Sequence, residues 1–361
     1  MSKAVATPSV PATGMPGSSE SSKIHASLPG DSTIIAAQRA LATGSDAPGS
    51  DALGSDAPAG QGARSGVGRR VLGGMGLLLA AGCSPARVLN DLAPQRLVAQ
   101  GLAYGDGPRR TLDVYAPGAA RSAGPSPVVV FLYGGGWKDG DKATYRFVGG
   151  ALAQRGAIVV IPDYRLYPQV RYPDFLRDCA AAVRWACDNA ASVAAQHSPA
   201  PNRAAPGPVF LMGHSAGAYN AAMLAFDARW LGAEGLRPRE ALRGLIGLAG
   251  PYDFLPLHTA ELASIFGGAE RIDTQPITYA GTVGPPAFLA AGSADTTVMP
   301  ANTLRLAARI RGAGGFAEDR IYPGVNHIEI IGAMAAPLRF LAPSLRDTLG
   351  FLGLRRADDS A

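Results

Sequence analysis

From about residue 99 onward, continuous apolar runs alternate with segments that carry a helical pattern. A short apolar run rich in valine is typical of a strand that is buried on both faces. Strands that alternate with helices along the chain predict a parallel sheet with helices on both of its faces. We therefore expect one α/β domain over residues 99–361 and no second folded domain.

The individual elements follow from the same pattern. After a hairpin formed by 101–105 and 109–117, strands are predicted at 127–135, 157–166, 208–215, 242–251, 286–295 and 319–324. Helices are predicted at 144–156 and 174–189, and a long helical segment is expected to close the chain. Residues 252–284 show no strand pattern, so we expect a small insertion near the site.

The strand at 208–215 runs into Gly213-His214-Ser215-Ala216-Gly217, and small residues suited to a helix follow. A serine at a sharp strand-to-helix turn projects its hydroxyl above the sheet, and flanking glycines leave room for close backbone contact. A serine hydroxyl is a weak nucleophile unless it has a base and donors for the oxyanion that it creates. This stretch predicts a nucleophilic Ser215, with the N–H of Ala216 at the helix N-terminus as an oxyanion donor.

Three consecutive glycines, residues 134–136, lie at the end of the strand predicted at 127–135. No side chain on these residues would cover their N–H groups. An enzyme built around a serine elbow takes its other oxyanion donors from a loop of this kind. The alternative is an ordinary flexible turn, which the position of the loop, one strand–helix unit into the parallel part, makes less favoured.

The base and the acid are expected later in the chain, in the order Ser, Asp, His. Asp295 ends the strand at 286–295, where its carboxylate would reach the edge of the sheet that bears Ser215. Of the five histidines, His327 is the one that lies beyond Asp295. We expect His327 to take the proton of Ser215 and Asp295 to orient His327, with Asp253 as the rival acid.

Composition limits the classes of function. The chain has 361 residues, of which 47% are hydrophobic and 17% charged, and its formal net charge is +5. No run of Lys and Arg with interleaved aromatics occurs, so nucleic-acid binding is not expected. Cys179 and Cys187 would lie about 12 Å apart on one helix, beyond the reach of a disulfide. No spacing of Cys and His suggests a metal site, and no cofactor is expected.

The N-terminal part differs from the rest. Residues 1–65 are rich in Ser, Gly, Pro and Ala, and near-identical pentads fill Gly44 to Pro58. This composition predicts a disordered low-complexity extension.

Residues 66–83 are predicted to be a signal segment. Arg69 and Arg70 precede twelve apolar or small residues, a length that fits a secretion signal and is too short to span a bilayer. The segment ends in LAAGC, which resembles a bacterial lipoprotein signal and implies a lipid on Cys83. We expect export to the bacterial cell envelope by the Sec or twin-arginine route, with a lipid anchor facing the periplasm and residues 84–98 as a linker.

Taken together, YGGGW, DYRLYP, GHSAG, GSAD and the late NH resemble the α/β-hydrolase serine esterases. More narrowly, they are similar to the hormone-sensitive-lipase-like carboxylesterases and to the feruloyl/acetylxylan esterase and kynurenine formamidase group. The resemblance covers about residues 99–352 and implies an α/β-hydrolase fold. It also implies that the second and third glycines of the loop, Gly135 and Gly136, donate to the oxyanion together with Ala216.

One position departs from the family pattern, because Tyr133 stands where the family usually has a histidine before the glycines. That histidine helps to hold the loop, so the change bears on loop geometry and substrate class. Tyr133, Trp137 and His214 are our candidates for lining the substrate pocket, although a tryptophan beside a glycine loop can simply shield it. Asp163 matches a family position with a structural role.

These features predict a serine hydrolase that cleaves small carboxylic esters through an acyl-enzyme. An aryl-formamidase-like amide hydrolase shares every motif. The alternative from another class is a hydrolase-fold protein that binds a ligand without catalysis. A membrane contact is expected only through a lipid on Cys83, and the sequence leaves the acyl group, the alcohol and the oligomeric state open.

Overall fold

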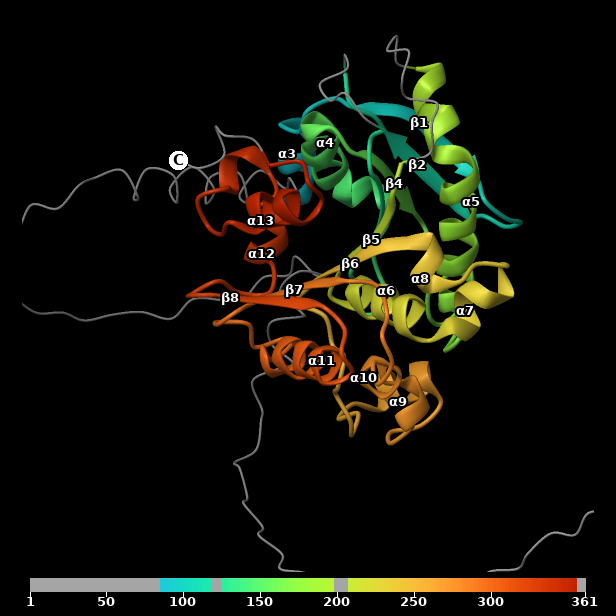
Figure 1. Ribbon diagram of the computed structural model, residues 1–361, viewed down its shortest axis with the longest axis vertical. Helices are drawn as coiled ribbons and strands as arrows, with labels where there is room; N and C mark the ends of the chain where they lie inside the picture. Colours follow the sequence, from blue (N-terminus) through green and yellow to red (C-terminus); the bar gives the residue numbers. More distant parts are fainter. Residues whose placement is uncertain (1–84, 119–124, 198–206, 356–361) are drawn as a thin grey trace, which may run out of the picture. The chain divides into compact units, whose positions relative to one another are not determined.

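The buried apolar runs become neighbouring strands of one eight-stranded sheet, in the spatial order β1-β2-β4-β3-β5-β6-β7-β8 (Figure 1). The computed structural model describes residues 85–118, 125–197 and 207–355. β1 pairs antiparallel with β2 and β2 with β4, and all the other pairs are parallel. The strands are β1 (Leu97–Ala103), β2 (Thr111–Tyr115), β3 (Val128–Leu132), β4 (Ile158–Pro162), β5 (Val209–His214), β6 (Leu242–Leu248), β7 (Ala287–Gly292) and β8 (Ala317–Tyr322).

Helices cover both faces of the sheet, which confirms the predicted α/β class. α4 (Arg146–Arg155) and α13 (Ser344–Phe351) lie on one face, and α5 (Asp174–Gln196), α6 (Ala216–Phe226) and α11 (Ala301–Gly312) lie on the other (Figure 1). The shorter helices are α3 (Pro85–Asp91), η1 (Lys142–Tyr145), α7 (Ala228–Ala233), α8 (Pro238–Ala241), α9 (Ala260–Phe266), η2 (Ile272–Thr274), α10 (Pro276–Tyr279), α12 (Glu329–Gly332) and η3 (Ala336–Leu338).

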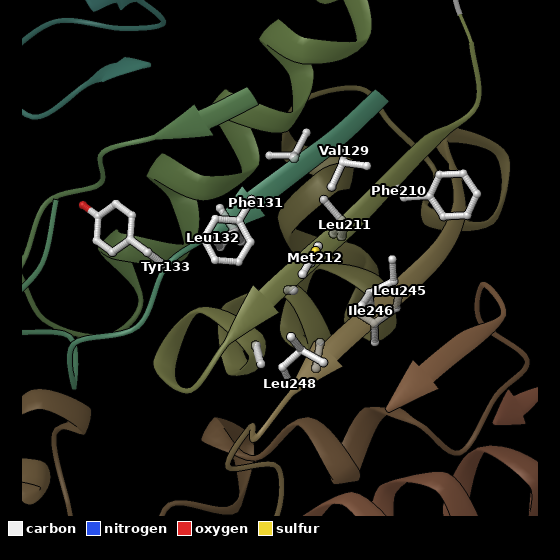
Figure 2. Packing of buried hydrophobic residues seen from close by; sticks show 14 of the residues in the cluster. Val129, Phe131, Leu132, Tyr133, Phe210, Leu211, Met212, Leu245, Ile246 and Leu248 are labelled. Carbon is white, nitrogen blue, oxygen red and sulfur yellow. The ribbon is translucent and has the colours of Figure 1, made fainter. Parts of the chain in front are cut away.

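The central strands are apolar on both faces because both faces are covered. Every residue of β3, β4 and β5 is buried. In register, Val130 of β3 lies beside Leu211 of β5, which lies beside Leu245 of β6. Figure 2 shows their neighbours, such as Val129 and Ile246, packed along these three strands. The core therefore fixes the strand ends from which the site is built.

The closing segment differs from the long helix that we predicted. It is divided into α12, η3 and α13. Pro337 lies in η3, and Pro343 stands directly before α13. Proline has no backbone N–H and clashes with the preceding helical turn, so each of these two positions kinks or breaks a continuous helix.

Part of the predicted linker, residues 84–98, has regular structure. It contains α3 and the start of β1. The side chain of Asn90 on α3 donates to the carbonyl of Ala143 at 2.8 Å and accepts from the N–H of Phe147 at 3.0 Å. These two hydrogen bonds fasten α3 to the start of α4.

The insertion is present as expected, since residues 252–284 contain α9, η2 and α10 and no strand. The predicted extension 1–65, the signal segment 66–83 and Cys83 lie outside the described residues. Within the described part, no helix has the length and apolar character needed to cross a membrane.

Candidate active site

Four chain segments that carry the predicted site residues meet at the carboxyl edge of the sheet. The glycine loop follows β3, Ser215 follows β5, Asp295 follows β7 and His327 follows β8. In a parallel sheet the carboxyl ends of neighbouring strands share one edge, and ligand sites are built there.

Ser215 is held in a strained turn. Its φ is +55° and its ψ is −125°, in a region that residues with a side chain rarely adopt. Its N–H donates to the carbonyl of Leu248 at 2.9 Å. Its carbonyl accepts from the N–H groups of Ala218 and Tyr219, at 2.9 Å and 3.1 Å, which starts α6.

The glycines on either side of the elbow are required by close backbone contact. A β-carbon on Gly213 would collide with the backbone of Gly217. A β-carbon on Gly217 would collide with the carbonyl oxygen of Leu132, at the end of β3. Side chains at these positions would push the elbow away from β3 and from the loop that follows it.

A line of hydrogen bonds joins the three predicted catalytic residues. His327 Nε2 lies 2.9 Å from Ser215 Oγ, and His327 Nδ1 lies 2.8 Å from Asp295 Oδ2. His327 and Asp295 are buried, whereas Ser215 is partly exposed. Since Asp295 accepts the Nδ1 proton, Nε2 is left free to take the proton of Ser215.

Asp295 has one oxygen for the backbone and one for the histidine. Oδ1 accepts from the N–H groups of Thr297 and Val298, at 2.9 Å and 2.8 Å, which leaves Oδ2 directed at His327. The rival acid, Asp253, instead forms an ion pair with Arg305 at 2.6 Å.

His214 forms a hydrogen bond with the backbone of the proposed base, His327. Its Nε2 lies 2.9 Å from the carbonyl oxygen of His327, and the two rings are 4.9 Å apart. Because the carbonyl can only accept, His214 Nε2 carries the proton. Burial, followed by the neighbouring His327, lowers the pKa of His214 to about 3. His214 therefore stays neutral and holds the backbone of His327.

The second and third glycines of the loop have N–H groups that are available to a ligand. Gly135 has φ +136° and Gly136 has φ +59°, which are positions that favour glycine. Among the residues that the structure describes, none accepts a hydrogen bond from the N–H of Gly135, Gly136 or Ala216. These three groups are the donors that the sequence predicts for the oxyanion.

Tyr133 lies beneath the loop, not in a substrate pocket. It has no exposed surface, and its hydroxyl donates to Asp163 Oδ1 at 2.9 Å and accepts from Arg109 Nη2 at 2.8 Å. Figure 2 shows its ring beyond the end of β3, with the hydroxyl directed away from β5 and β6. The expectation that Tyr133 lines the pocket is corrected, because its ring is packed between Tyr145 and Tyr164.

Trp137 and His214 are also withdrawn from the surface. The Trp137 side chain is buried, and its ring packs against four aromatic rings; these are Phe175, Tyr219, Phe254 and Phe266. His214 is buried as well. Both side chains are thus packed inside the protein, and the expectation that they line the substrate pocket stays a prediction.

Sequence reasoning missed two residues that shape the site. Asn220 accepts from the indole of Trp137, and Arg109 bonds both Tyr133 and the carbonyl of Gly140. Both partnerships join distant parts of the chain, and no local motif marks them. The two described cysteines, Cys179 and Cys187, are free, as their spacing predicted. No cluster of metal-ligating side chains occurs within the described residues.

The close packing at the elbow can be tested by comparing Gly217→Ala with the same substitution at a glycine that has no close neighbours. Gly217→Ala should destabilise the protein by about 1–3 kcal/mol and abolish activity, because the new methyl group overlaps the Leu132 carbonyl. Gly232→Ala in α7, where a β-carbon would meet nothing within 4 Å, should leave stability unchanged or raised by up to about 1 kcal/mol. Urea unfolding of both variants checks this, and equal stability of the two would contradict the packing account.

His214 predicts a pH dependence of stability. Its folded-state pKa of about 3 lies below the ordinary histidine value of 6.5, so the unfolded state binds the proton more readily. The contribution to stability is complete above about pH 6.5 and falls by about 1.4 kcal/mol per pH unit as the pH drops toward 3. His214→Gln keeps a donor for the His327 carbonyl but does not titrate, so it should lose about 2 kcal/mol less than the wild type between pH 7 and pH 5.

Urea midpoints at the two pH values measure this difference, with the exposed His258→Gln as the control. A His214→Gln variant with the same pH dependence as the wild type would show that His214 is not buried in its neutral form.

Two curated relatives are similar to this chain over more than half of its length. Isoprenylcysteine alpha-carbonyl methylesterase ICME from Arabidopsis thaliana is 30% identical over 263 residues, which is 67% of this chain and 58% of that protein. Esterase LipC from Mycobacterium tuberculosis is 25% identical over 246 residues, which is 62% of this chain and 58% of that protein. The chain thus spans less than two thirds of the length of either relative.

The fold is shared with solved esterases. Esterase B from Lactobacillus rhamnosis matches with a TM-score of 0.60 at 20% identity, over 79% of this chain and 95% of that one. The family model named BD-FAE matches residues 112–310, more than half of the chain. The chain therefore has the α/β-hydrolase fold and belongs to the BD-FAE family.

Proposed function

We propose that this protein is a serine hydrolase that cleaves carboxylic esters through an acyl-enzyme. The observation that carries the proposal is the line from Ser215 Oγ through His327 to Asp295, at 2.9 Å and 2.8 Å. The unpaired N–H groups of the elbow and the glycine loop are the second support. The names of the two curated relatives, an esterase and a methylesterase, agree with this class.

Acylation follows from the placement of these groups. Ser215 Oγ attacks the ester carbonyl carbon while its proton moves to His327 Nε2 and the carbonyl electron pair moves to oxygen. The resulting oxyanion accepts from the N–H groups of Gly135, Gly136 and Ala216. When the electron pair returns, the carbon–oxygen bond to the alcohol breaks, and His327 gives its proton to the leaving alcohol oxygen.

Deacylation repeats the same steps with water. His327 takes a proton from water as the water oxygen attacks the acyl carbon, and the same donors hold the second oxyanion. The bond to Ser215 Oγ then breaks, and the proton on His327 returns to that oxygen. Asp295 stabilises the charged imidazole in both halves of the reaction.

The proposal predicts how a panel of substrates and two variants behave. The panel contains p-nitrophenyl acetate, p-nitrophenyl butyrate, methyl ferulate and the formamide N-formylkynurenine. Residues 84–361 should hydrolyse at least one of the three esters. Ser215→Ala should lower kcat by at least about 10³-fold, and Asp295→Asn by about 10³–10⁴-fold, because the asparagine stabilises the wrong tautomer of His327. Asp253→Asn removes the same charge from a carboxylate that pairs with Arg305, and should retain near-native turnover.

Spectrophotometric rates, with circular dichroism to show that each variant is folded, decide the result. Equal losses in Asp295→Asn and Asp253→Asn would remove Asp295 from the proposed triad. Turnover confined to N-formylkynurenine would replace the ester by a formamide, and turnover that survives in Ser215→Ala would refute the serine mechanism.

We also propose that the protein is exported and anchored in a bacterial membrane by a lipid on Cys83. The support is the sequence from Arg69 to Cys83, with its two arginines, apolar stretch and LAAGC ending. Expressed as the full chain in a bacterial host fed radiolabelled palmitate, the wild type and Cys187→Ser should carry label in the membrane fraction. Cys83→Ser should carry none. Label that persists in Cys83→Ser would disprove the anchor.

A further inference from the structure

Asn220 is a buried amide on α6 that the proposed reaction does not use. Its side chain has no exposed surface. Its Oδ1 accepts from Trp137 Nε1 at 3.0 Å, and its Nδ2 lies 3.7 Å from the Sγ of Cys179 on α5. An indole N–H can only donate, so the amide has a single satisfactory orientation. Both the oxygen and the nitrogen of the Asn220 amide thus have a partner.

Its partner, Trp137, follows directly on the glycines of the loop. Trp137 has φ +61°, a conformation that a residue with a large side chain keeps only when its surroundings enforce it. Its carbonyl accepts from the N–H of Tyr167 at 2.8 Å. Its ring meets Tyr219 and Phe266 edge to face, with centroids 5.1 Å and 4.8 Å apart. The hydrogen bond to Asn220 adds a directional contact to this packing.

The loop is held on both sides of its free N–H groups. Before the glycines, Tyr133 is fastened to Asp163, and Tyr164 donates to the carbonyl of Tyr133 at 2.8 Å. After the glycines, Trp137 is fastened to Asn220. Within the loop, the carbonyl of Gly135 accepts from the N–H groups of Lys138 and Asp139, at 3.2 Å and 3.0 Å. Because the glycines have no side chains of their own to pack, the two anchors add to these backbone bonds in setting the directions of the loop N–H groups.

Asn220 and the third oxyanion donor belong to the same helix. Ala216 is the first residue of α6, and Asn220 follows it by four positions, or about one helical turn. We propose that Asn220 is a positioning residue which, by holding Trp137, fixes the glycine-loop donors relative to the N–H of Ala216. The proposal rests on the proposed ester hydrolysis and assigns no chemical step to Asn220.

Three variants separate positioning from stability. Asn220→Leu removes the acceptor at similar volume, and Trp137→Phe removes the donor while keeping an aromatic ring. Each single change leaves one buried polar group without its partner, which costs stability, whereas the double variant removes both. Asn189→Leu is the matched control, since Asn189 bonds the carbonyl of Trp185 within α5.

The readouts are kcat and KM for p-nitrophenyl acetate, the thermal midpoint, and inhibition by a trifluoromethyl ketone. The ketone forms a tetrahedral oxyanion on the serine, so its affinity reports the donors directly. Asn220→Leu should lower kcat by about 10–100-fold, less than the loss of one whole donor, with KM changed by less than about threefold. The affinity for the trifluoromethyl ketone should fall by a similar factor in the same variant. The double variant should recover thermal stability but not kcat.

Other outcomes overturn the proposal. Asn220→Leu with kcat within about threefold of the wild type, or a double variant that recovers kcat together with its midpoint, would reduce Asn220 to a packing role. The wild type and Ser215→Ala run beside these variants. A folded but inactive wild type refutes the proposed function and this inference with it, whereas an active wild type matched by Asn220→Leu refutes the inference alone.

Discussion

The site depends on backbone packing against backbone. Gly217, at the start of α6, lies so close to the end of β3 that a β-carbon there would collide with the carbonyl oxygen of Leu132, the last residue of β3, and with that of Tyr133, the next residue. This contact joins the helix that begins at the nucleophile to the strand that leads into the glycine loop. If α6 and the end of β3 moved apart, Ser215 would be separated from the N–H groups of the loop. The glycines of the elbow are therefore a packing requirement as well as a turn requirement.

The loop is held by a buried polar network in which Tyr133 takes the place of a histidine. Asp163 accepts from the Tyr133 hydroxyl, from the N–H of Lys142 and from Lys142 Nζ, so its buried charge is compensated. Arg109 adds bonds to Tyr133 and to the carbonyl of Gly140. The departure from the family pattern thus leaves the loop anchored. The phenol of Tyr133 donates a hydrogen bond to the Asp163 carboxylate and accepts one from Arg109.

Local patterns predicted the parts of the molecule that local physics controls. The valine-rich run before the glycines and the run before Gly213 are buried strands as expected, and His327 lies within hydrogen-bond distance of both Ser215 and Asp295. Chain order and strand ends sufficed for these residues, because parallel strands bring their carboxyl ends to one edge.

The positions of Trp137 and Asn220 depend on contacts between distant parts of the chain, which local patterns do not reveal. Trp137 was expected in the pocket, but rings from α5, α6 and α9, together with Phe254, enclose it. Asn220 carries no motif, and its partner lies 83 positions away. The prediction of one long closing helix was wrong for a local reason, because Pro337 and Pro343 interrupt that segment.

The proposed mechanism requires that Ser215 becomes acylated during turnover. The most direct measurement is mass spectrometry of peptides from protein that has been mixed with p-nitrophenyl acetate and quenched in acid within the first turnover. We expect one acetyl group on the peptide that contains Ser215, and we expect it to be lost when the substrate is used up before the quench. Substrate turnover with no acetyl group on that peptide, or a stable acetyl group on another residue, would contradict it.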